Sequence, residues 1–311
     1  MNVRENQFEQ VIETFPDAAR DRLRSVMTHA GKLPAAQCKA LVEVLGIDVE
    51  DFMVQLLPIA KLYAITPISH FRVGAVAKAR PQAGAEEYDL YLGANIEFTG
   101  QALSQAVHAE QAATMNAWLQ GAVQVRSIAV SAIPCGYCRQ FLYELEGSEA
   151  LMIVTPCQGS RGFCASPLSE FLPSAFGPRD LKKKAGLMAS PKTQPNLILK
   201  TAPSDALVLE ALSAANQSYA PYTNNLSGCA IQASDGRIYR GRYAENAAFN
   251  PSLSPLQTAI SCMNMGRLAG DQTITRAVLV EKSSGSTQRG ITELVLRSFA
   301  PHVSLECFEA E

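Results

Sequence analysis

His108-Ala109-Glu110 and Pro134-Cys135-Gly136-Tyr137-Cys138 are the two stretches that decide the fold and the site of this chain. Together they offer one imidazole and two thiols as metal ligands, and Glu110 adds a carboxylate that the metal does not need. A structural zinc ion is closed by four protein ligands, whereas a catalytic zinc ion has three and keeps the fourth position for water. The pattern therefore predicts a catalytic zinc centre bound by His108, Cys135 and Cys138, with water as the fourth ligand.

The residues around these motifs predict a helix, a strand and a second helix. Residues 107–119 contain no Gly or Pro and are typical of a helix, with the motif histidine and glutamate in its first turn. The apolar, β-branched run 125–130 has the length of a buried strand. Pro134 suits the first turn of the next helix, so that the two cysteines lie near its amino end. Free N–H groups and the helix dipole favour thiolates there, and we expect the metal at the two helix ends.

The charges of such a site assign a role to Glu110. Two thiolates cancel the charge of Zn²⁺ and a neutral imidazole adds none, so the centre tolerates a bound hydroxide. The metal lowers the pKa of its water to about 7. Glu110 can take the proton that the water loses and pass it to the substrate. We therefore expect a proton shuttle rather than a ligand.

Further motifs accompany these two, and together they resemble the cytidine deaminase family in its long, homodimeric form. His-x-Glu with Pro-Cys-x-x-Cys is the signature of zinc nucleobase deaminases. The motifs that carry the resemblance are Phe71–Ala75, Gly93–Phe98, Val107–Gln111, Pro134–Phe141, Leu172–Leu181 and Tyr243–Pro251. The similarity runs from about Pro58 to the carboxyl end. It implies hydrolytic deamination of cytidine and 2′-deoxycytidine to uridine and 2′-deoxyuridine, with release of ammonia, in pyrimidine salvage.

The resemblance also implies roles for the motif residues. His108, Cys135 and Cys138 correspond to the ligands of one zinc ion, and Glu110 corresponds to the group that carries protons to N3 of the base and to the leaving ammonia. One departure stands out at residues 132–133, which are Ala-Ile where the long form usually has Tyr-Thr. A backbone contact to the leaving amine survives that change, but a contribution from either hydroxyl does not.

The nucleoside-binding positions follow from the same resemblance. Asn95 and Glu97 match an Asn-x-Glu that holds the ribose hydroxyls, and Phe71 matches an aromatic that packs on the pyrimidine. Ala109 contacts the base edge through its backbone. Phe176 matches a further aromatic near the nucleoside.

The composition bounds the alternatives. The formal charge is −2, and the only basic cluster is Lys182-Lys183-Lys184, whereas a groove for nucleic acid normally shows as a basic stripe. A nucleotide deaminase would place a phosphate near Glu97, which would repel it. A purely structural zinc domain would give Glu110 no purpose. These points favour a free nucleoside, with a CMP, dCMP or nucleic-acid cytosine deaminase as the alternative.

Targeting signals and a framework of disulfides are not expected. The amino end is polar, and no apolar stretch reaches the ~20 residues of a membrane span, so we expect a cytoplasmic protein with no membrane partner. Most of the cysteines outside the motif are expected to be buried free thiols. Cys157 and Cys164 invite the hypothesis of a second metal site, but no further ligand lies near them at a suitable spacing.

The chain also contains an internal repeat. Arg126–Val130 is echoed by Arg276–Val280, and Tyr91–Glu97 by Tyr239–Glu245. This alignment places Pro255, Gln257, Gly285 and Gln288 opposite His108, Glu110, Cys135 and Cys138, respectively. The second copy therefore lacks the metal groups and is expected to have a structural role. In the long form of the family two such chains form a homodimer, in which the carboxyl-terminal domain of one chain helps to cover the active site of the other.

Strands that alternate with helices predict a cytidine-deaminase-like α/β fold. We expect a three-layer α/β/α arrangement with a mixed sheet, duplicated, after a small helical region. Strands are predicted at 72–77, 88–93, 125–130 and 151–154. The predicted parts are a helical amino-terminal region (1–57), a catalytic zinc domain (58–181), a linker (182–203) and a degenerate deaminase-like domain without catalytic function (204–311).

Overall fold

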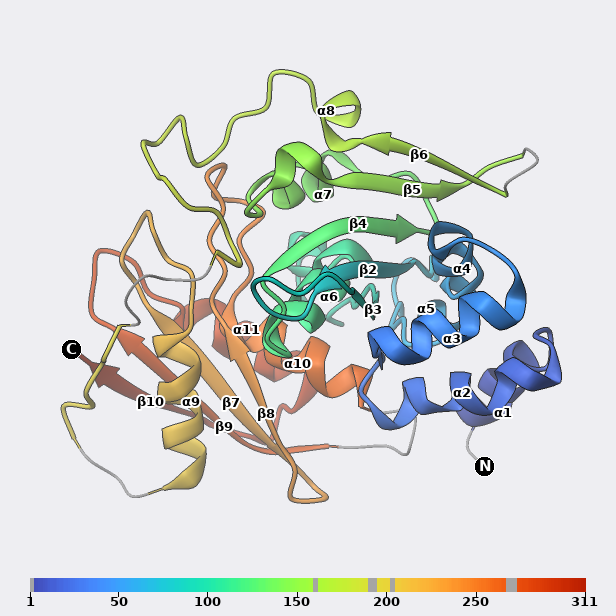
Figure 1. The fold of residues 1–311 in the computed structure, drawn as a ribbon. Helices are drawn as coiled ribbons and strands as arrows, with labels where there is room; N and C mark the ends of the chain where they lie inside the picture. The colour runs from blue at the N-terminus through green and yellow to red at the C-terminus, as the bar shows by residue number, and fades with distance from the viewer. Residues whose placement is uncertain (1–2, 159–161, 190–194, 202–204, 267–272) are drawn as a thin grey trace.

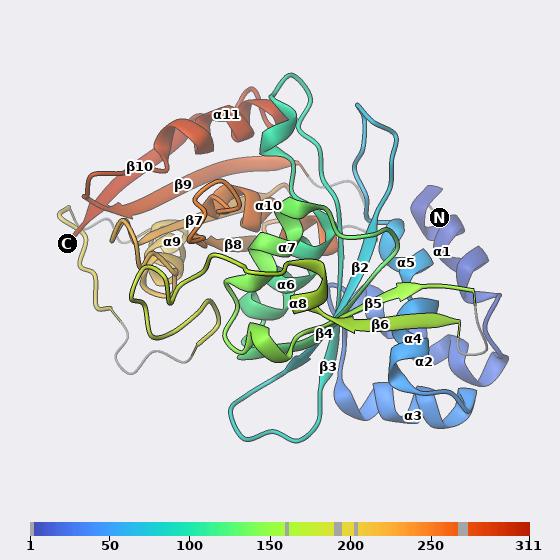
Figure 2. The ribbon, with the colours of Figure 1, turned by 90° about the horizontal axis from the view of Figure 1, so that it is seen from above.

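The computed structural model describes residues 3–158, 162–189, 195–201, 205–266 and 273–311. Its strands form two mixed sheets, and helices cover both faces of each sheet (Figures 1 and 2). Residues 190–194 and 202–203 of the expected linker lie outside the described residues. The architecture confirms the duplicated three-layer α/β/α fold that the sequence predicted.

The first sheet belongs to the half of the chain that carries the metal motifs. Its strand order is β1-β3-β2-β4-β5-β6, and the bounds are β1 Lys32–Leu33, β2 Gly74–Arg80, β3 Asp89–Ala94, β4 Gln124–Val130, β5 Met152–Pro156 and β6 Phe163–Pro167. Strands β4 and β5 pair in parallel, and the other neighbours are antiparallel. Strands β2 to β5 confirm the four predicted strands. Strands β1 and β6 were not predicted, because β1 is only two residues long and β6 contains few residues with a preference for strands.

Five helices at the amino end cover one face of this sheet (Figure 1). They are α1 Val3–Ile12, α2 Asp17–Thr28, α3 Ala35–Leu45, α4 Val49–Gln55 and α5 Leu57–Lys61. Their buried side chains, among them Phe8 and Phe52, share a core with Val76 and Leu92 of the sheet. Because side chains alternate along a strand, Ala75 and Ala77 of β2 face the other way. They pack in a second core, with the helices that carry the metal motifs.

The second sheet repeats the topology of the first. Its strand order is β10-β9-β7-β8, with β7 Ser227–Ala233, β8 Ile238–Arg242, β9 Ile274–Lys282 and β10 Leu305–Ala310. Strand β7 pairs antiparallel with β8 and β9, as β2 does with β3 and β4, and β9 pairs in parallel with β10, as β4 does with β5. Helix α9 (Ala206–Asn216) covers one face, and α10 (Pro255–Met265) and α11 (Arg289–Phe299) cover the other.

The two halves meet through α10 and its counterpart α6 (Ala109–Leu119), which lie together between the two sheets (Figure 1). Both helices begin with a capping box that has Gln in its third position. Gln111 Nε2 donates to the carbonyl oxygen of Pro251 at 3.1 Å, and Gln257 Nε2 donates to that of Gln105 at 2.7 Å. Each half therefore gives the other the same hydrogen bond, as in a two-fold symmetric dimer.

These capping boxes correct the alignment that was based on sequence alone. They pair Gln257 with Gln111, so the match of Gln257 to Glu110 and that of Pro255 to His108 were wrong by one residue. Ser254 occupies the position of His108 as the residue that caps the helix. Helix α7 (Gly136–Tyr143), which carries Cys138, has α11 as its counterpart in the second half. Cys135 before α7 is extended, whereas Gln288 before α11 is helical, so the match of Gly285 and Gln288 to Cys135 and Cys138 stays a prediction. The corrected positions still hold no metal ligand.

A second correction concerns two cysteines outside the metal motif. Cys157 and Cys164 form a disulfide with a Cα–Cα distance of 5.7 Å, whereas free thiols were predicted for most of the cysteines outside the motif and a second metal site was the hypothesis raised for this pair. Cys157 directly follows β5, and Cys164 lies in the adjacent β6. Their closeness follows from pairing with the unpredicted β6. None of the described helices is long and apolar enough to cross a membrane.

Candidate zinc centre and active site

The three predicted ligands converge where α6 and α7 begin. The ligand atoms of His108, Cys135 and Cys138 all lie within 4.8 Å of one another. Cys135 Sγ is 3.5 Å from His108 Nδ1 and 3.7 Å from Cys138 Sγ. Tetrahedral zinc with the usual Zn–S and Zn–N bond lengths separates two sulfurs by about 3.8 Å and a sulfur from a nitrogen by about 3.5 Å. The two distances from Cys135 therefore match those around one zinc ion, and the third ligand pair lies within the same 4.8 Å.

The two helices start slightly later than the sequence suggested. His108 caps α6 from the preceding position, because antiparallel pairing of Val107 with Ile96 keeps the chain extended up to that point. Helix α7 starts at Gly136, so Pro134 lies before the helix rather than in its first turn, and Cys135 is the capping residue. Both corrections leave the ligands at helix amino ends.

The thiol of Cys135 is in a setting that favours its ionised form. Hydrogen bonds with Cys138 and with His108, partly offset by burial, lower the pKa of Cys135 to about 3. A thiolate is the form in which cysteine binds a metal. Within the described part of the chain the cluster holds three ligands, which is the number expected for a catalytic rather than a structural ion.

Glu110 lies in the first turn of α6, directly beside this cluster. Its side chain is only 4% exposed, and burial raises the pKa of its carboxyl group. It does not belong to the ligand cluster. A buried carboxyl group with a raised pKa can both accept and return a proton, as a general acid–base must.

A pocket of about 350 Å³ opens on the cluster and brings the predicted residues together. Phe71, Asn95, Glu97 and Ala109 line it, together with Glu110 and the ligands His108 and Cys135. Phe176 is not among the residues that line it. The space suits a small molecule, and its lining is predominantly apolar with a few converging polar groups, as is usual for such sites.

The backbone around Glu97 holds its carboxylate in place. Its Oε2 accepts hydrogen bonds from the backbone N–H groups of Ile68 at 2.8 Å and Ser69 at 3.0 Å, and its Oε1 accepts one from the Ser69 hydroxyl. Burial raises the pKa of Glu97, but these hydrogen bonds outweigh it and hold the pKa below its usual value. The pocket therefore contains a fixed negative charge.

Ser69 was missed by the sequence analysis, although the repeat contained a signal for it. In the second half the carboxylate of Glu245 accepts the same three hydrogen bonds, from the N–H groups of Tyr222 and Thr223 and from the Thr223 hydroxyl. A hydroxyl residue at matching positions before both glutamates is the pattern that would have revealed this contact. The same contact is present in the second half of the chain, which lacks the metal ligands and is called the silent half below. The contact therefore belongs to the repeated fold.

Asn95 acts on the loop that carries Phe71. Its Oδ1 accepts from the Val73 N–H at 2.9 Å, and its Nδ2 donates to the Phe71 carbonyl oxygen at 2.9 Å. The aromatic ring itself is 62% exposed. Asn95 therefore holds the backbone of Phe71 while the ring stays free to meet a ligand.

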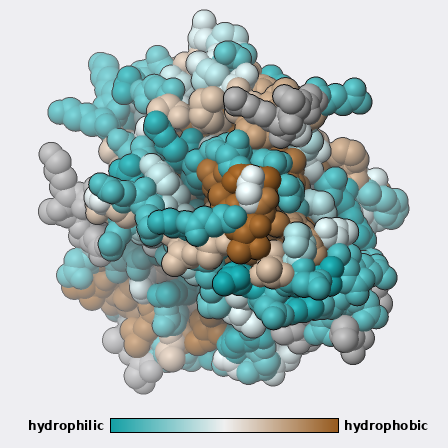
Figure 3. Space-filling view, turned by 45° about the vertical axis from the view of Figure 1, so that its right-hand side comes forward, coloured by the Kyte–Doolittle hydropathy of each residue, from teal (hydrophilic) through white to brown (hydrophobic). Residues whose placement is uncertain are grey.

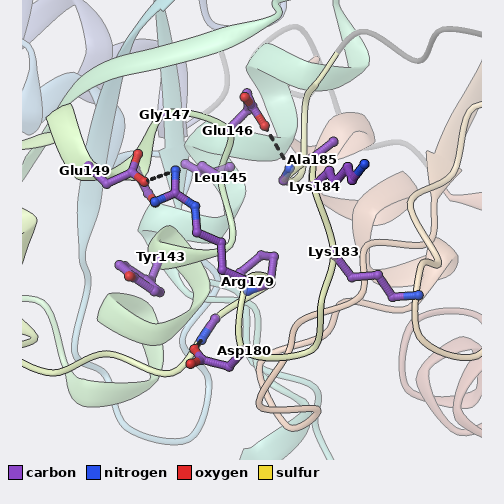
Figure 4. Close-up of a pocket in the computed structure, with 14 residues that line it drawn as sticks. Tyr143, Leu145, Glu146, Gly147, Glu149, Arg179, Asp180, Lys183, Lys184 and Ala185 are labelled. Atoms are coloured by element: carbon purple, nitrogen blue, oxygen red, sulfur yellow. Dashed lines mark hydrogen bonds and ion pairs between the residues drawn. The ribbon is translucent and has the colours of Figure 1, made fainter.

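Phe176 lies on a separate segment that is anchored to the middle of α7. Its carbonyl oxygen accepts a hydrogen bond from Gln140 Nε2 at 2.8 Å. Figure 4 shows the following residues folded back on the same region, with Arg179 pointing toward Glu149 at 2.6 Å. The ring is 47% exposed and stands at the surface rather than in the pocket of the zinc cluster.

Tyr137 is a second residue that the sequence analysis did not single out. Its ring stacks on the imidazole of His108, with centroids 5.2 Å apart and an angle of 25° between the planes. Its hydroxyl donates to the carbonyl oxygen of Asn250 in the other half, at 2.6 Å. No sequence signal marks it, because it fills one of the two free positions of Cys-x-x-Cys.

Comparisons with known proteins agree with this geometry. Residues 47–155 and residues 168–293 each match a family model described as the cytidine and deoxycytidylate deaminase zinc-binding region. Similar curated proteins named cytidine deaminase come from Photorhabdus laumondii (47% identical, covering 91% of this chain and 89% of the relative), Sodalis glossinidius (42%, 95% and 96%) and Aliivibrio fischeri (38%, 97% and 97%). The second family match falls on the half that lacks the metal ligands, as a duplication predicts. The chain therefore belongs to the cytidine and deoxycytidylate deaminase family.

Proposed function

We propose that this protein is a zinc-dependent hydrolase that converts cytidine and 2′-deoxycytidine to uridine and 2′-deoxyuridine and releases ammonia. The observation that carries the proposal is the set of three ligands with a buried, non-ligating Glu110 at the end of a pocket of nucleoside size. The relatives named cytidine deaminase, which the chain matches over most of its length, support the same reaction.

The residues of the chain divide the work of this reaction. His108, Cys135 and Cys138 would hold the zinc ion, which would supply a water with its pKa lowered to about 7 as the nucleophile for C4 of the base. Glu110 would accept one proton of that water and deliver it to N3, and would then accept the second proton from the oxygen now bonded to C4 and deliver it to the departing amine. Both protons of the water are then used, and the C4–N bond breaks as the C4 carbonyl forms. The burial of Glu110 excludes bulk water from these transfers, and its raised pKa favours return of the proton.

The charge of Glu97 supports a nucleoside rather than a nucleotide. An ionised carboxylate offers about four lone-pair positions, and three are used by Ile68 and Ser69. The remaining position can accept a hydrogen bond from a ribose hydroxyl, whereas a phosphate group beside it would be repelled. Asn95, Phe71 and the backbone of Ala109 complete the proposed nucleoside contacts.

The apolar rim of the pocket supports a second copy of the chain as a partner. Phe71, Leu103 and Ile133 line the pocket and are 62%, 61% and 65% exposed. Phe176 and Phe249 are further exposed aromatics of the same chain, and Figure 3 shows a compact hydrophobic patch on a largely hydrophilic face. Large exposed apolar groups gathered in one place mark interaction sites. The proposal is a homodimer in which the partner covers the pocket and brings Phe176 near the nucleoside.

The proposal assigns the parts of the chain as the sequence suggested. Residues 58–181 form the catalytic domain, 1–57 its helical support, 182–203 the linker and 204–311 the non-catalytic domain. Within the proposed linker, Leu187 contacts the catalytic half through two backbone hydrogen bonds. Its N–H donates to the carbonyl oxygen of Glu144, and its carbonyl oxygen accepts from the N–H of Glu146, both at 2.8 Å.

Ammonia release tests the proposal directly. Purified protein of known zinc content is incubated with cytidine, 2′-deoxycytidine, CMP and a cytosine-containing single strand. Release from the two nucleosides only, with one zinc per chain, is the expected result. Release from CMP or from the strand would move the assignment to a nucleotide or nucleic-acid deaminase, and bound zinc without turnover on any substrate would refute the catalytic reading. Light scattering on the same sample tests the dimer.

A further inference from the structure

One face of the zinc-bearing helix α7 is polar and is not used by the metal. Tyr137, Gln140 and Glu144 follow one another at intervals of three and four residues, which places them along one side of a helix. The adjacent side is buried in the catalytic half and includes Cys138 and Phe141. Glu144 is fully buried, although it is an acidic residue. Tyr137 and Gln140 are half-buried, and a polar face of this kind needs hydrogen-bond partners where it is covered.

Partners at the amino end and in the middle of α7 come from the silent half, in addition to the bond from Gln140 Nε2 to Phe176 O at 2.8 Å. The Tyr137 hydroxyl donates to Asn250 O at 2.6 Å. One turn further on, Asn246 Nδ2 donates to Gln140 O at 3.1 Å, and Gln140 Nε2 reaches Asn246 Oδ1 at 3.4 Å. Residues 246–250, here called segment 246–250, therefore run alongside the helix that carries both cysteine ligands.

At the other end of the helix, Glu144 extends the same contact. Its Oε2 accepts from the backbone N–H of Ala247 at 2.8 Å, and its Oε1 accepts from the hydroxyls of Tyr219 at 2.7 Å and Tyr222 at 2.6 Å. All three donors belong to the silent half. Burial raises the pKa of Glu144 against these hydrogen bonds. The helix is thus held to the other half over its whole length.

The same contact reaches the histidine ligand. The Tyr137 ring stacks on His108, so the bond from its hydroxyl to segment 246–250 fixes the plane against which the imidazole lies. Gln111, one turn into α6, donates to Pro251 O immediately after the segment. Both zinc-bearing helices are therefore bound to one short piece of the half that has lost its own metal groups.

Building on the proposed deaminase function, we propose that segment 246–250 positions the zinc ligands and that Tyr137 is the positioning residue that couples it to His108. Groups that orient a metal ligand without touching the metal typically change metal affinity or activity by about 10–100-fold when they are altered. The silent half then has a task beyond filling space, because it sets the geometry of the neighbouring metal centre.

Tyr137→Phe in the full-length holoenzyme is the sharpest test, because it retains the ring and removes only the hydroxyl. We expect zinc to transfer to a chelator about 10-fold faster than from the wild type, and kcat for cytidine to fall by about the same factor, the lower end of the range for such groups, while KM stays within about twofold. Ser298→Ala is a matched control, because it also removes a bond between the halves, from the Ser298 hydroxyl to Thr99 O at 2.9 Å, without touching α7. Zinc transfer and kcat are expected to be unchanged in it.

Asn246→Ala tests the same proposal from the silent half, and we expect the same direction of change in zinc transfer and kcat. If both variants lower only the temperature of unfolding and leave zinc transfer and kcat at the wild-type values, the positioning role is overturned. If the wild type binds zinc but does not deaminate cytidine, the proposed function fails. The rates of zinc transfer then still decide whether segment 246–250 positions the ligands.

Discussion

The close approach of β3 to α6 makes Gly93 a sensitive position far from the chemistry. A Cβ atom at Gly93 would lie 2.0 Å from the backbone nitrogen of Ala113, whereas ordinary contact begins at 3.4 Å. Gly93→Ala therefore forces the helix and the strand apart by up to about 1.4 Å. Helix α6 carries Glu110 and is capped by His108, so this displacement moves the proposed proton shuttle and one proposed metal ligand together. A misplacement of about 1 Å can cost on the order of 100-fold in rate.

The second half offers a control with the same steric problem. A Cβ at Gly241 would lie 2.4 Å from the backbone nitrogen of Ala259 in α10, and that helix carries no ligand. Overpacking of this kind costs about 1–3 kcal/mol, so both Gly93→Ala and Gly241→Ala should unfold at lower urea concentration than the wild type.

The two variants should differ in activity. For Gly93→Ala we expect kcat/KM for cytidine to fall by about 100-fold with partial loss of zinc, and for Gly241→Ala a change of less than about tenfold. Steady-state kinetics, zinc analysis and urea unfolding on the same preparations provide the comparison. The reasoning is refuted if Gly93→Ala turns over like the wild type, or if Gly241→Ala loses as much kcat/KM as Gly93→Ala.

Three further predictions concern single carboxylates. Glu110→Gln should lose more than about 10⁴-fold in kcat, beyond the usual range for a general acid–base because the group acts twice, with one zinc still bound; a variant with a tenth of the activity would contradict the shuttle. Hydrogen bonds hold the pKa of Glu97 below 4.5, so its contribution to stability is present above that value and is lost as the pH falls through the folded pKa. In urea titrations at decreasing pH, the free energy of unfolding of Glu97→Gln should therefore fall less steeply than that of the wild type. An equal pH dependence in the two proteins would contradict this prediction. Glu144→Ala leaves three donors of the silent half without their acceptor. At about 1–3 kcal/mol for each buried unsatisfied group, it should lower the free energy of unfolding by several kcal/mol. Glu144→Gln should lower it clearly less, and equal losses in the two variants would show that these hydrogen bonds do not contribute to stability.

The metal site and the main strands could be predicted because their residues lie in short, continuous stretches of sequence. His108, Glu110 and the cysteine pair lie in short stretches whose spacing already defines a metal site, and the strands at 72–77 and 125–130 follow from continuous apolar runs. The repeat was also visible, but its register depended on Gln111 and Gln257, which only the capping geometry identifies as equivalent.

Contacts between distant residues could not be predicted from one sequence. Glu144 looks like an ordinary helix residue, because its partners lie 75 to 103 positions further along the chain. The disulfide of Cys157 and Cys164 depends on a strand that the local pattern does not reveal. Tyr137 could not be recognised either, since stacking on a ligand leaves no mark in the spacing of the motif.

The reciprocal bonds of Gln111 and Gln257 have a consequence for assembly at low concentration. A symmetric contact between separate chains weakens on dilution. Here both sides belong to one polypeptide and meet at an effective concentration that does not depend on the protein concentration. Dilution therefore cannot separate the half with the zinc-ligand motifs from the second half of the same chain. Because the two halves are covalently joined, one half can lack the metal ligands while the other retains them. An assembly of identical subunits cannot have this asymmetry, since every subunit has the same sequence.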